Sequence, residues 1–549
     1  MPFGSGYREV KELCQKLKPL YGKQIDRIFD AYLLEDKDGR EQIKTYLEAL
    51  AARKLPGSTD NQAPETVLVP PSEDQAQGSY KLGEVTYAGK PMYSFGLQEK
   101  EWIQHVGVFG RTGAGKTNLG YLILQQLQRK NKPALVFDWK RNYRDLLARD
   151  EFKDVDVYTI GRPVAPFTFN PLIPPEGTDP KTWLKKLNEV IAHAYMLGNG
   201  VLYLLQKTLD SVYEEFGVYS GNVDRWPTFK DVLKKAKNMD ASGRAAGWLS
   251  STLRALSSLC FGDMGELVNR PKACDPKELL KGTAILELDA LTQQDKVFFS
   301  SSLLLWIHHH RMQEATREKF KHAILIEEAH HLLSGERRNL VGGQSVMEIT
   351  FREIREFGES LIILDQHPSQ ISMPALGNTY ATICLNLKHS KDVNAMGQCM
   401  LLQGEEKNIL GELEVGQAVV KLQGRASRPF LMEIPEFNIQ KGQITDMQIR
   451  EKMAEKIDTS RALLKNSDSS GSSQNSGFNL TSLEKKFLGD VKKHPESGIA
   501  ARYRRLGISA RQGNKVKKRL LDKDLIEESM EKTDTGRRKM VSLSNEDGK

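Results

Sequence analysis

A strand, a glycine-rich loop and a helix in immediate succession constrain the fold of this chain more than any other feature. Residues 106–109 (Val-Gly-Val-Phe) have the apolar character of a short buried strand, and residues 118–128 favour a helix. The loop between them, residues 110–117, reads Gly-Arg-Thr-Gly-Ala-Gly-Lys-Thr and fills every fixed position of a phosphate-binding loop. The alternative is a glycine-rich turn without a ligand, but the flanking strand and helix favour phosphate binding.

The residue types in this loop match the chemistry of a nucleoside triphosphate. Backbone N–H groups turn inward around the phosphates, the lysine bridges the β- and γ-oxygens, and the threonine hydroxyl binds Mg²⁺. We therefore predict that ATP and Mg²⁺ are the cofactors, with Lys116 in a catalytic role and Thr117 as a metal ligand. The residues predicted to contact the nucleotide are Gly110, Arg111, Thr112, Gly113, Ala114, Gly115, Lys116, Thr117 and Asn118.

Two further apolar segments end in polar side chains that could complete a hydrolytic site. Residues 323–326 (Ala-Ile-Leu-Ile) precede Glu327 and Glu328, and residues 361–365 precede Gln366. We predict that Glu327 holds Mg²⁺ and that Glu328 polarises the attacking water as a general base. A polar side chain at Gln366 could sense the γ-phosphate. The alternative for the two glutamates is a pair of ordinary acids at a strand end.

The pattern along the chain predicts an α/β core with additional units on either side. Six short apolar runs are typical of buried parallel strands, at residues 106–109, 134–137, 284–288, 323–326, 361–364 and 381–385. A hairpin is expected at residues 82–97. The predicted divisions are a helical N-terminal region (1–54) with a turn at Asp38-Gly39, a linker (55–81), an ATPase core (82–440) with a helical insertion at about 179–264, a helical extension (441–465), a flexible linker (466–479) and a C-terminal domain (480–549).

The order of these motifs resembles the HerA/FtsK superfamily of ring-forming DNA-pumping ATPases from about residue 82 to 435. The segment Phe137-Asp138-Trp139-Lys140 resembles the Asp-x-Lys of FtsK and of conjugative coupling ATPases. Glu327-Glu328-Ala329-His330 is similar to the Asp-Glu-Ala-His of HerA proteins. Residues 352–358, followed by Gln366-His367-Pro368-Ser369, resemble the arginine-rich helix and Gln-Arg-Pro-Ser of the same proteins.

This resemblance implies a RecA-like P-loop core and a ring, expected to be a hexamer, that moves along double-stranded DNA. It also implies that an arginine reaches the ATP of the neighbouring subunit. Arg352 and Arg355 match that position, three residues apart on one expected helix face; the alternative is a solvated helix paired with Glu353 and Glu356. Such rings also work with partner nucleases and serve in antiviral defence and in DNA transfer. Two departures are Glu327 in place of aspartate and a single hairpin where HerA proteins carry a small β-barrel.

The positive charge of the chain is concentrated at its C-terminus. The net charge is +8, and residues 480–549 contain 18 Lys and Arg against 11 Asp and Glu. Helical patterns at 483–491, 498–506 and 510–521, followed by an alternating stretch with a turn at 534–536, resemble a winged helix. A basic face on the last helix fits a DNA groove, whereas the alternative is a solvated helix or a protein contact. The residues predicted to bind DNA are Arg511, Lys515, Lys518, Arg519, Arg537 and Arg538.

Other features exclude several classes of protein. The five cysteines are scattered without a CxxC pair, so neither a zinc site nor a disulfide framework is predicted. No segment has the pattern of a signal peptide or a membrane span, which leads us to expect a cytoplasmic protein without a membrane partner. Besides a DNA motor, the sequence allows an ATP-switched regulator whose winged helix recognises a DNA site, and an ATPase that moves protein substrates.

Overall fold

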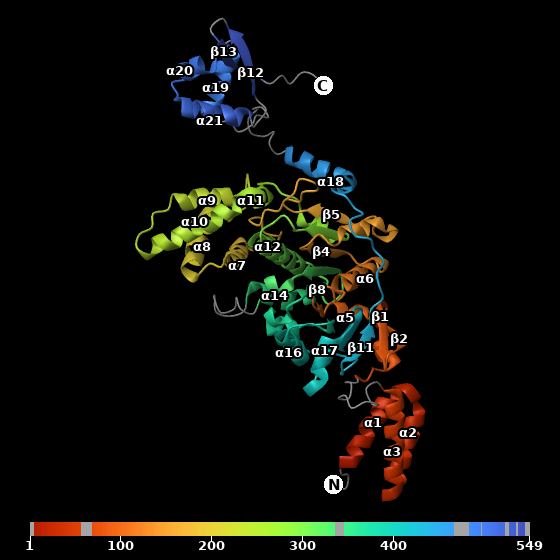
Figure 1. Cartoon of the computed structure of the whole chain (residues 1–549). Helices are drawn as coiled ribbons and strands as arrows, with labels where there is room; N and C mark the ends of the chain where they lie inside the picture. The colour runs from red at the N-terminus through yellow and green to blue at the C-terminus, as the bar shows by residue number, and fades with distance from the viewer. Residues whose placement is uncertain are drawn as a thin grey trace. The chain divides into compact units, whose positions relative to one another are not determined.

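The computed structural model describes residues 5–55, 68–334, 345–465, 482–495, 497–521, 526–533 and 536–543 (Figure 1). The chain divides into two compact units, Met1–Ser467 and Asp468–Lys549, and each is described by itself. The linker predicted at residues 466–479 lies outside the described residues, as do residues 56–67 of the linker predicted at 55–81.

One sheet of 11 strands organises the first unit, in the order β2-β1-β11-β10-β9-β3-β8-β7-β4-β6-β5. The strands from β9 to β5 in this order pair in parallel, and the strands from β10 to β2 extend the sheet with antiparallel pairs. The strands are β1 (Tyr80–Tyr87), β2 (Lys90–Leu97), β3 (Val106–Phe109), β4 (Ala134–Asp138), β5 (Asp156–Thr159), β6 (Ala284–Glu287), β7 (His322–Glu327), β8 (Glu359–Asp365), β9 (Ala381–Cys384), β10 (Gln417–Leu422) and β11 (Phe430–Glu433).

The parallel strands form the centre of the hydrophobic core. Every residue of β3, β4, β7 and β8 is buried, because helices cover both faces of the sheet. The carboxyl ends of these strands meet at one edge. Strand β3 lies between β8 and β9, so the loop that follows β3 opens at the position where α/β sheets bind their ligands.

The six strands predicted from apolar runs are present, but three other strands of the first unit were not predicted. Strand β5 is only four residues long at the outer edge of the sheet. Strands β10 and β11 carry polar residues among apolar ones, including Lys421, which is 5% exposed. Their antiparallel pairing needs no continuous apolar run, which is the signal that identified the other strands.

The predicted hairpin forms β1 and β2, and β1 pairs with β11 at residues 84–86, so the hairpin extends the central sheet. The prediction that residues 55–81 are a linker throughout is wrong, because a short helix, α4 (Glu73–Ala76), precedes β1, which begins at Tyr80. The core therefore begins two residues before the predicted boundary.

Three helices at the N-terminus pack together and onto the tip of this hairpin. They are α1 (Ser5–Tyr21), α2 (Lys23–Leu34) and α3 (Lys37–Lys54). The prediction of a turn at Asp38-Gly39 is wrong, because both of these residues lie inside α3. The helix begins earlier because Asp36 caps it: the Asp36 side chain accepts a hydrogen bond from the Gly39 N–H at 2.9 Å. The Tyr87 hydroxyl donates to the Lys16 carbonyl and belongs to the hydrophobic cluster of the bundle.

The remaining helices of the first unit connect and cover the strands. Helices α7 to α11 make up the predicted insertion, which continues four residues past its expected end at 264. No helix in the described ranges is long and apolar enough to cross a membrane. These helices are α5 (Glu99–Trp102), α6 (Lys116–Arg129), α7 (Pro180–Tyr195), α8 (Asn199–Glu215), α9 (Phe229–Lys237), α10 (Arg244–Leu259), α11 (Gly262–Val268), α12 (Gln293–Met312), α14 (Val346–Glu353), α15 (Met373–Gly377), α16 (Ser390–Cys399), α17 (Ile409–Glu412) and α18 (Asp446–Lys465).

The second unit has its own small core. Its elements are α19 (Ser482–Lys493), α20 (Ile499–Arg505), α21 (Ala510–Leu521), β12 (Ile526–Thr533) and β13 (Gly536–Leu543). Phe487, Leu520 and Val541 are buried together, and Arg502, also fully buried, donates to the carboxylate of Asp490 at 3.2 Å. The order of three helices and a hairpin is the order that the sequence predicts; the turn residues 534 and 535 lie outside the described part.

Arg425, in the turn between β10 and β11, connects the two ends of the core domain. Its guanidinium donates to both carboxylate oxygens of Glu101, at 2.6 and 3.1 Å, and to the carbonyls of Gln75, Gln77 and Gly96. Glu101 is 1% exposed, and Arg425 is the cation that pairs with it. One side chain therefore links β10–β11 to α4, α5 and β2.

We predict that Arg425→Ala lowers the free energy of unfolding by about 3–5 kcal/mol, because it leaves the buried Glu101 carboxylate without its cation. Chemical denaturation followed by circular dichroism measures this change. The matched control is Arg428→Ala, three residues away and exposed, which should change stability by less than about 0.5 kcal/mol. Equal effects of the two substitutions would contradict the role given to Arg425.

Candidate active site

The phosphate-binding loop follows β3 and ends where α6 begins, so the N–H groups of the first helical turn face the loop. Gly113 and Gly115 have φ of 81° and 108°, a region that side chains with a Cβ rarely adopt. At Gly110 the constraint is space, because an added Cβ would lie 2.9 Å from the Cβ of Leu385 on the β9 side. Backbone conformation therefore explains the glycines at 113 and 115, and lack of space explains the one at 110.

Lys116 lies against its own loop. Its Nζ donates to the carbonyls of Gly110, at 2.6 Å, and Arg111, at 3.1 Å. Burial lowers the pKa of this lysine, although Glu328 and Asp365 nearby oppose that effect. The structure thus places the ammonium group among the predicted nucleotide contacts and close to the acids of β7 and β8.

Asn118, predicted as a nucleotide contact, binds the segment that follows β11. Its amide nitrogen donates to the Pro435 carbonyl at 2.9 Å, and its amide oxygen accepts from the Phe437 N–H at 2.7 Å. The side chain therefore holds residues 435–437 beside the first turn of α6.

Glu327 closes β7 and is the candidate metal ligand. It is 7% exposed, and its Oε1 accepts from the Asn142 side chain at 3.4 Å. Its Oε2 is buried without a hydrogen-bond partner among the described residues. Burial, followed by the nearby charge of Asp138, raises the pKa of Glu327 to about 8.

An orphaned buried carboxylate oxygen next to a phosphate-binding loop is the arrangement that a hard cation satisfies. Thr117, one residue after the loop lysine, supplies the hydroxyl that such loops offer to Mg²⁺. The residues present therefore fit the predicted Mg²⁺, with Thr117 and Glu327 as its protein ligands. When bound, the ion would neutralise charge on the β- and γ-phosphates.

Glu328 is held at the centre of a chain of polar contacts. Its backbone is left-handed (φ 50°, ψ 45°), a strained conformation for a glutamate. Its Oε1 accepts from Lys140 Nζ at 2.5 Å and from the Gln366 amide. Gln366 in turn accepts from the Thr112 hydroxyl of the phosphate loop at 2.5 Å. The predicted general base and the predicted γ-phosphate sensor are thus in direct contact.

Lys140 belongs to this site but was recognised only as part of a family resemblance. The buried Asp138 at the end of β4 accepts hydrogen bonds from the N–H groups of Lys140, Asn142 and Tyr143, and so folds the turn that directs Lys140 and Asn142 toward β7. Only the pairing of β4 with β7 brings this turn to the glutamates. The sequence of residues 138–142 alone does not predict that this turn lies next to Glu327 and Glu328.

Asp365 and His330 lie at the same edge of the sheet and are bonded to each other. Fully buried Asp365 accepts from the His330 N–H at 2.7 Å, from His330 Nδ1 at 2.9 Å and from the His367 N–H at 2.7 Å. Burial opposes a charge on His330, but the hydrogen bond to Asp365 raises its pKa. Ligand atoms of Glu328, His330 and Asp365 lie within 4.8 Å of one another, within the site already described.

A salt-bridge network beside this edge anchors the start of α18. Glu287, the last residue of β6, is fully buried and pairs with Arg144 at 2.6 Å and with Arg162. Both arginines also contact Asp446, the first residue of α18, at 2.7 and 3.1 Å. The helix that leads to the second unit therefore begins at the carboxyl edge of the sheet.

Arg352 and Arg355 lie away from the phosphate loop of their own chain. Both are exposed, but they are not on one continuous helix as predicted: α14 ends at Glu353, and Arg355 is in a 3₁₀ turn (Ile354–Phe357). This turn precedes β8, whereas Gln366 follows it. Seven residues of strand separate the two ends by roughly 20 Å, more than an arginine side chain spans.

The predicted DNA contacts are in the second unit. Arg511, Lys515, Lys518 and Arg519 have their backbone in α21, and Arg537 and Arg538 have theirs in β13. The side chains of these six residues lie outside the described part of the structure.

Comparisons with known proteins agree with this geometry. A search of curated proteins gives no match. Among solved structures, VirB4 of Thermoanaerobacter pseudethanolicus is 16% identical, with a TM-score of 0.53 over 65% of this chain and 96% of that chain. The bacterial conjugative coupling protein TrwBdeltaN70 is 12% identical, with a TM-score of 0.47 over 70% of this chain and 97% of that chain. At such identities the likeness to VirB4 shows the fold.

The family described as "Helicase HerA, central domain" matches residues 80–398, more than half of the chain. The match begins at the first residue of β1 and includes the phosphate loop, both glutamates, Gln366 and the turn around Lys140. These residues are also the ones that the fold brings to one edge of the sheet. This chain belongs to the HerA central-domain family, and its core has the RecA-like P-loop ATPase fold.

Proposed function

We propose that this protein is a ring-forming motor that hydrolyses ATP at sites between subunits and moves along double-stranded DNA. The observation that carries the proposal is the position of Glu328. It lies partly buried directly after β7, in contact with Gln366 and Lys140, and Gln366 reaches the phosphate loop through Thr112. A carboxylate so placed can polarise a water aimed at the γ-phosphate.

Each residue of the site has a defined task in this proposal. The loop N–H groups and Lys116 bind the β- and γ-phosphates, while Thr117 and Glu327 hold Mg²⁺. Glu328 orients and deprotonates the water. Gln366, bonded to both the loop and Glu328, reports the state of the γ-phosphate to the base. Lys140 neutralises Glu328 in the described conformation.

The distance of Arg352 and Arg355 from their own phosphate loop supports an inter-subunit site. Because the length of β8, roughly 20 Å, separates these arginines from Gln366 and the phosphate loop, they would stabilise a transition state in a neighbouring subunit rather than in their own. The family resemblance makes a hexamer the expected ring. DNA would be held by the second unit, through Arg511, Lys515, Lys518, Arg519, Arg537 and Arg538. A cytoplasmic location, a partner nuclease, and a place in defence or DNA transfer belong to the same proposal.

The alternative is a regulator in which ATP sets the assembly state and the second unit recognises a particular DNA sequence. The compact second unit favours it as a second candidate, because such a unit can bind DNA without a motor. The two functions differ in how hydrolysis responds to DNA of arbitrary sequence.

We predict that generic duplex DNA stimulates steady ATP hydrolysis, and that Glu328→Gln slows it by about 10²-fold or more while nucleotide still binds. The measurement is phosphate release with and without DNA, together with nucleotide binding. Glu214→Gln, an exposed acid on the helical insertion, is the control. Slow turnover that ignores generic DNA would favour the regulator, and normal hydrolysis by the Gln variant would refute the base assignment.

A mixing experiment tests the arginines. Arg352→Ala or Arg355→Ala should lower hydrolysis by about 10³-fold if that residue acts in trans. A mixture with Glu328→Gln subunits should regain activity, since the intact arginine of one variant completes the intact site of the other. Arg254→Ala, exposed on the insertion, should hydrolyse ATP normally. Mixed rings that stay inactive would rule out the trans role.

The raised pKa of Glu327 gives a third prediction. With a pKa of about 8, this carboxyl is protonated at pH 7, and Mg²⁺ must displace the proton to bind. Affinity for Mg²⁺–nucleotide should therefore rise from pH 6.5 to 8 and level off above that. Calorimetry in buffers of different ionisation enthalpy measures the released proton, and Glu327→Gln should release about one proton fewer. Equal release by both proteins would contradict the assignment.

A further inference from the structure

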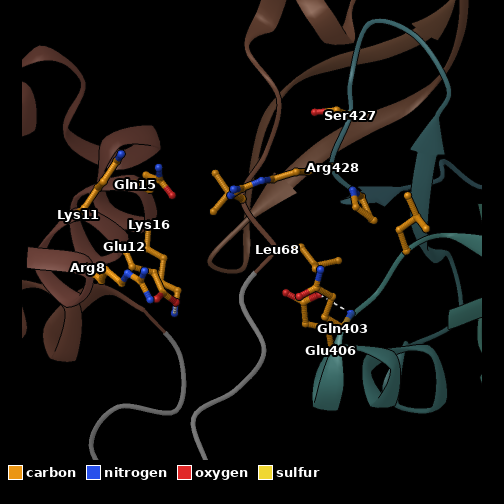
Figure 2. Close-up of a pocket in the computed structure, with 13 residues that line it drawn as sticks. Arg8, Lys11, Glu12, Gln15, Lys16, Leu68, Gln403, Glu406, Ser427 and Arg428 are labelled. Carbon is orange, nitrogen blue, oxygen red and sulfur yellow. Dashed lines mark hydrogen bonds and ion pairs between the residues drawn. The ribbon is translucent and has the colours of Figure 1, made fainter. Parts of the chain in front are cut away.

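A cavity of about 560 Å³ lies between the N-terminal bundle and the core domain, and the proposed function does not use it (Figure 2). Helix α1 forms one wall. A 3₁₀ turn at Gly404–Asn408 and the turn between β10 and β11 form the other. No lining residue belongs to the phosphate loop, so this is a second, separate site.

One face of α1 is directed into the cavity by helical spacing. The lining residues Arg8, Lys11, Glu12, Gln15 and Lys16 recur at intervals of three and four positions, which places them in one stripe. The opposite stripe is the apolar one, where Val10, Cys14 and Leu17 are buried in the bundle. The fold therefore turns the polar face of this helix toward the core.

The carboxylates in the cavity are already satisfied, whereas several cations are not. Glu12 pairs with Lys16 at 3.1 Å, and Glu406 accepts from the Gln403 N–H at 2.9 Å. Neither Arg8, Lys11 nor Arg428 pairs with a carboxylate among the residues that the structure describes.

These three cations approach from both walls. Arg8 and Lys11 project from α1, while Arg428 extends from the turn between β10 and β11 toward the helix (Figure 2). Positive charges that face each other across a cavity repel, and an anion between them removes that repulsion. Guanidinium and ammonium groups match phosphate in both charge and hydrogen bonding.

The lining also indicates which part of a phosphate-bearing ligand is contacted. No described lining residue is aromatic, so the cavity offers no surface on which a base could stack. Arginine, lysine, glutamine and serine side chains are the groups that bind phosphate and sugar oxygens without reading sequence. A free nucleotide would gain little from its base here, whereas a strand would contribute several phosphates.

We infer that this cavity binds the sugar–phosphate backbone of a nucleic acid strand, independently of base sequence. Arg8, Lys11 and Arg428 supply the contacts to phosphate. The site adds a nucleic-acid contact on the N-terminal side of the core domain, distinct from the contacts assigned to the second unit.

The test is a charge reversal in the full-length protein. Arg8→Glu/Lys11→Glu/Arg428→Glu should weaken binding of a fluorescent duplex or single-stranded oligonucleotide of mixed sequence by about tenfold or more at low salt. The slope of log affinity against log salt should fall by about 2–3, since each neutralised phosphate contributes about 0.9. Fluorescence anisotropy between 50 and 200 mM salt, the range over which phosphate contacts are most visible, measures both.

The matched control is Lys23→Glu/Arg27→Glu/Arg53→Glu, which makes the same charge change with exposed residues of the bundle outside the cavity. Equal losses of affinity and slope in the two triple variants would overturn the inference. The number of nucleotides bound per chain is a further measurement. If the cavity variant bound one nucleotide fewer than the wild type and the control variant did not, the cavity would be a site for free nucleotide, and the inference would also be overturned.

The outcome is separable from that of the proposed function. Neither triple variant touches the ATP site, so hydrolysis without DNA should be unchanged in both. If DNA failed to stimulate the wild-type ATPase, the motor would be refuted, but the comparison of DNA affinities would still decide the role of the cavity.

Discussion

The parallel register of four neighbouring strands sets the distances on which the candidate active site depends. Phe109 pairs with Asp365 between β3 and β8, and Glu327 pairs with Leu364 between β7 and β8. The phosphate loop, the acids and Gln366 therefore leave the sheet at the same height. A slip of one residue would turn each terminal side chain to the opposite face and separate the base from the loop.

The same edge concentrates buried carboxylates, and the structure stabilises each of them in a different way. Asp138 is solvated by three backbone N–H groups, Glu287 by two arginines, and Asp365 by His330 and backbone N–H groups. Glu327 differs because its Oε2 has no hydrogen-bond partner among the described residues. This oxygen is the one that the proposed Mg²⁺ would satisfy.

The features that could be predicted from the sequence are those formed by residues adjacent in the chain. The phosphate loop, the strand that ends in Glu327 and Glu328, and the order of helices and hairpin in the second unit all follow from adjacent residues. The contact between Lys140 and Glu328 does not, because 188 positions separate the two residues and only the sheet order joins them. The helix cap at Asp36 was not predicted, because Gly39 near the start of α3 was interpreted as a turn residue. Strands β10 and β11 were not predicted because their polar residues interrupt the continuous apolar run that identified the other strands.

The anchoring of α18 has a mechanical consequence. This helix is 20 residues long, about 30 Å, and the chain continues from its far end to the second unit. The helix is attached to the core along its length: Met453 and Ile457 are buried in the core, and Lys456 pairs with Asp156 of β5. At its first residue, Asp446 is joined through Arg144 and Arg162 to Glu287 at the end of β6. Strand β6 pairs directly with β4, the strand that supports Lys140. A force applied to the second unit would therefore enter the core domain through β5 and β6, next to the strand that supports Lys140.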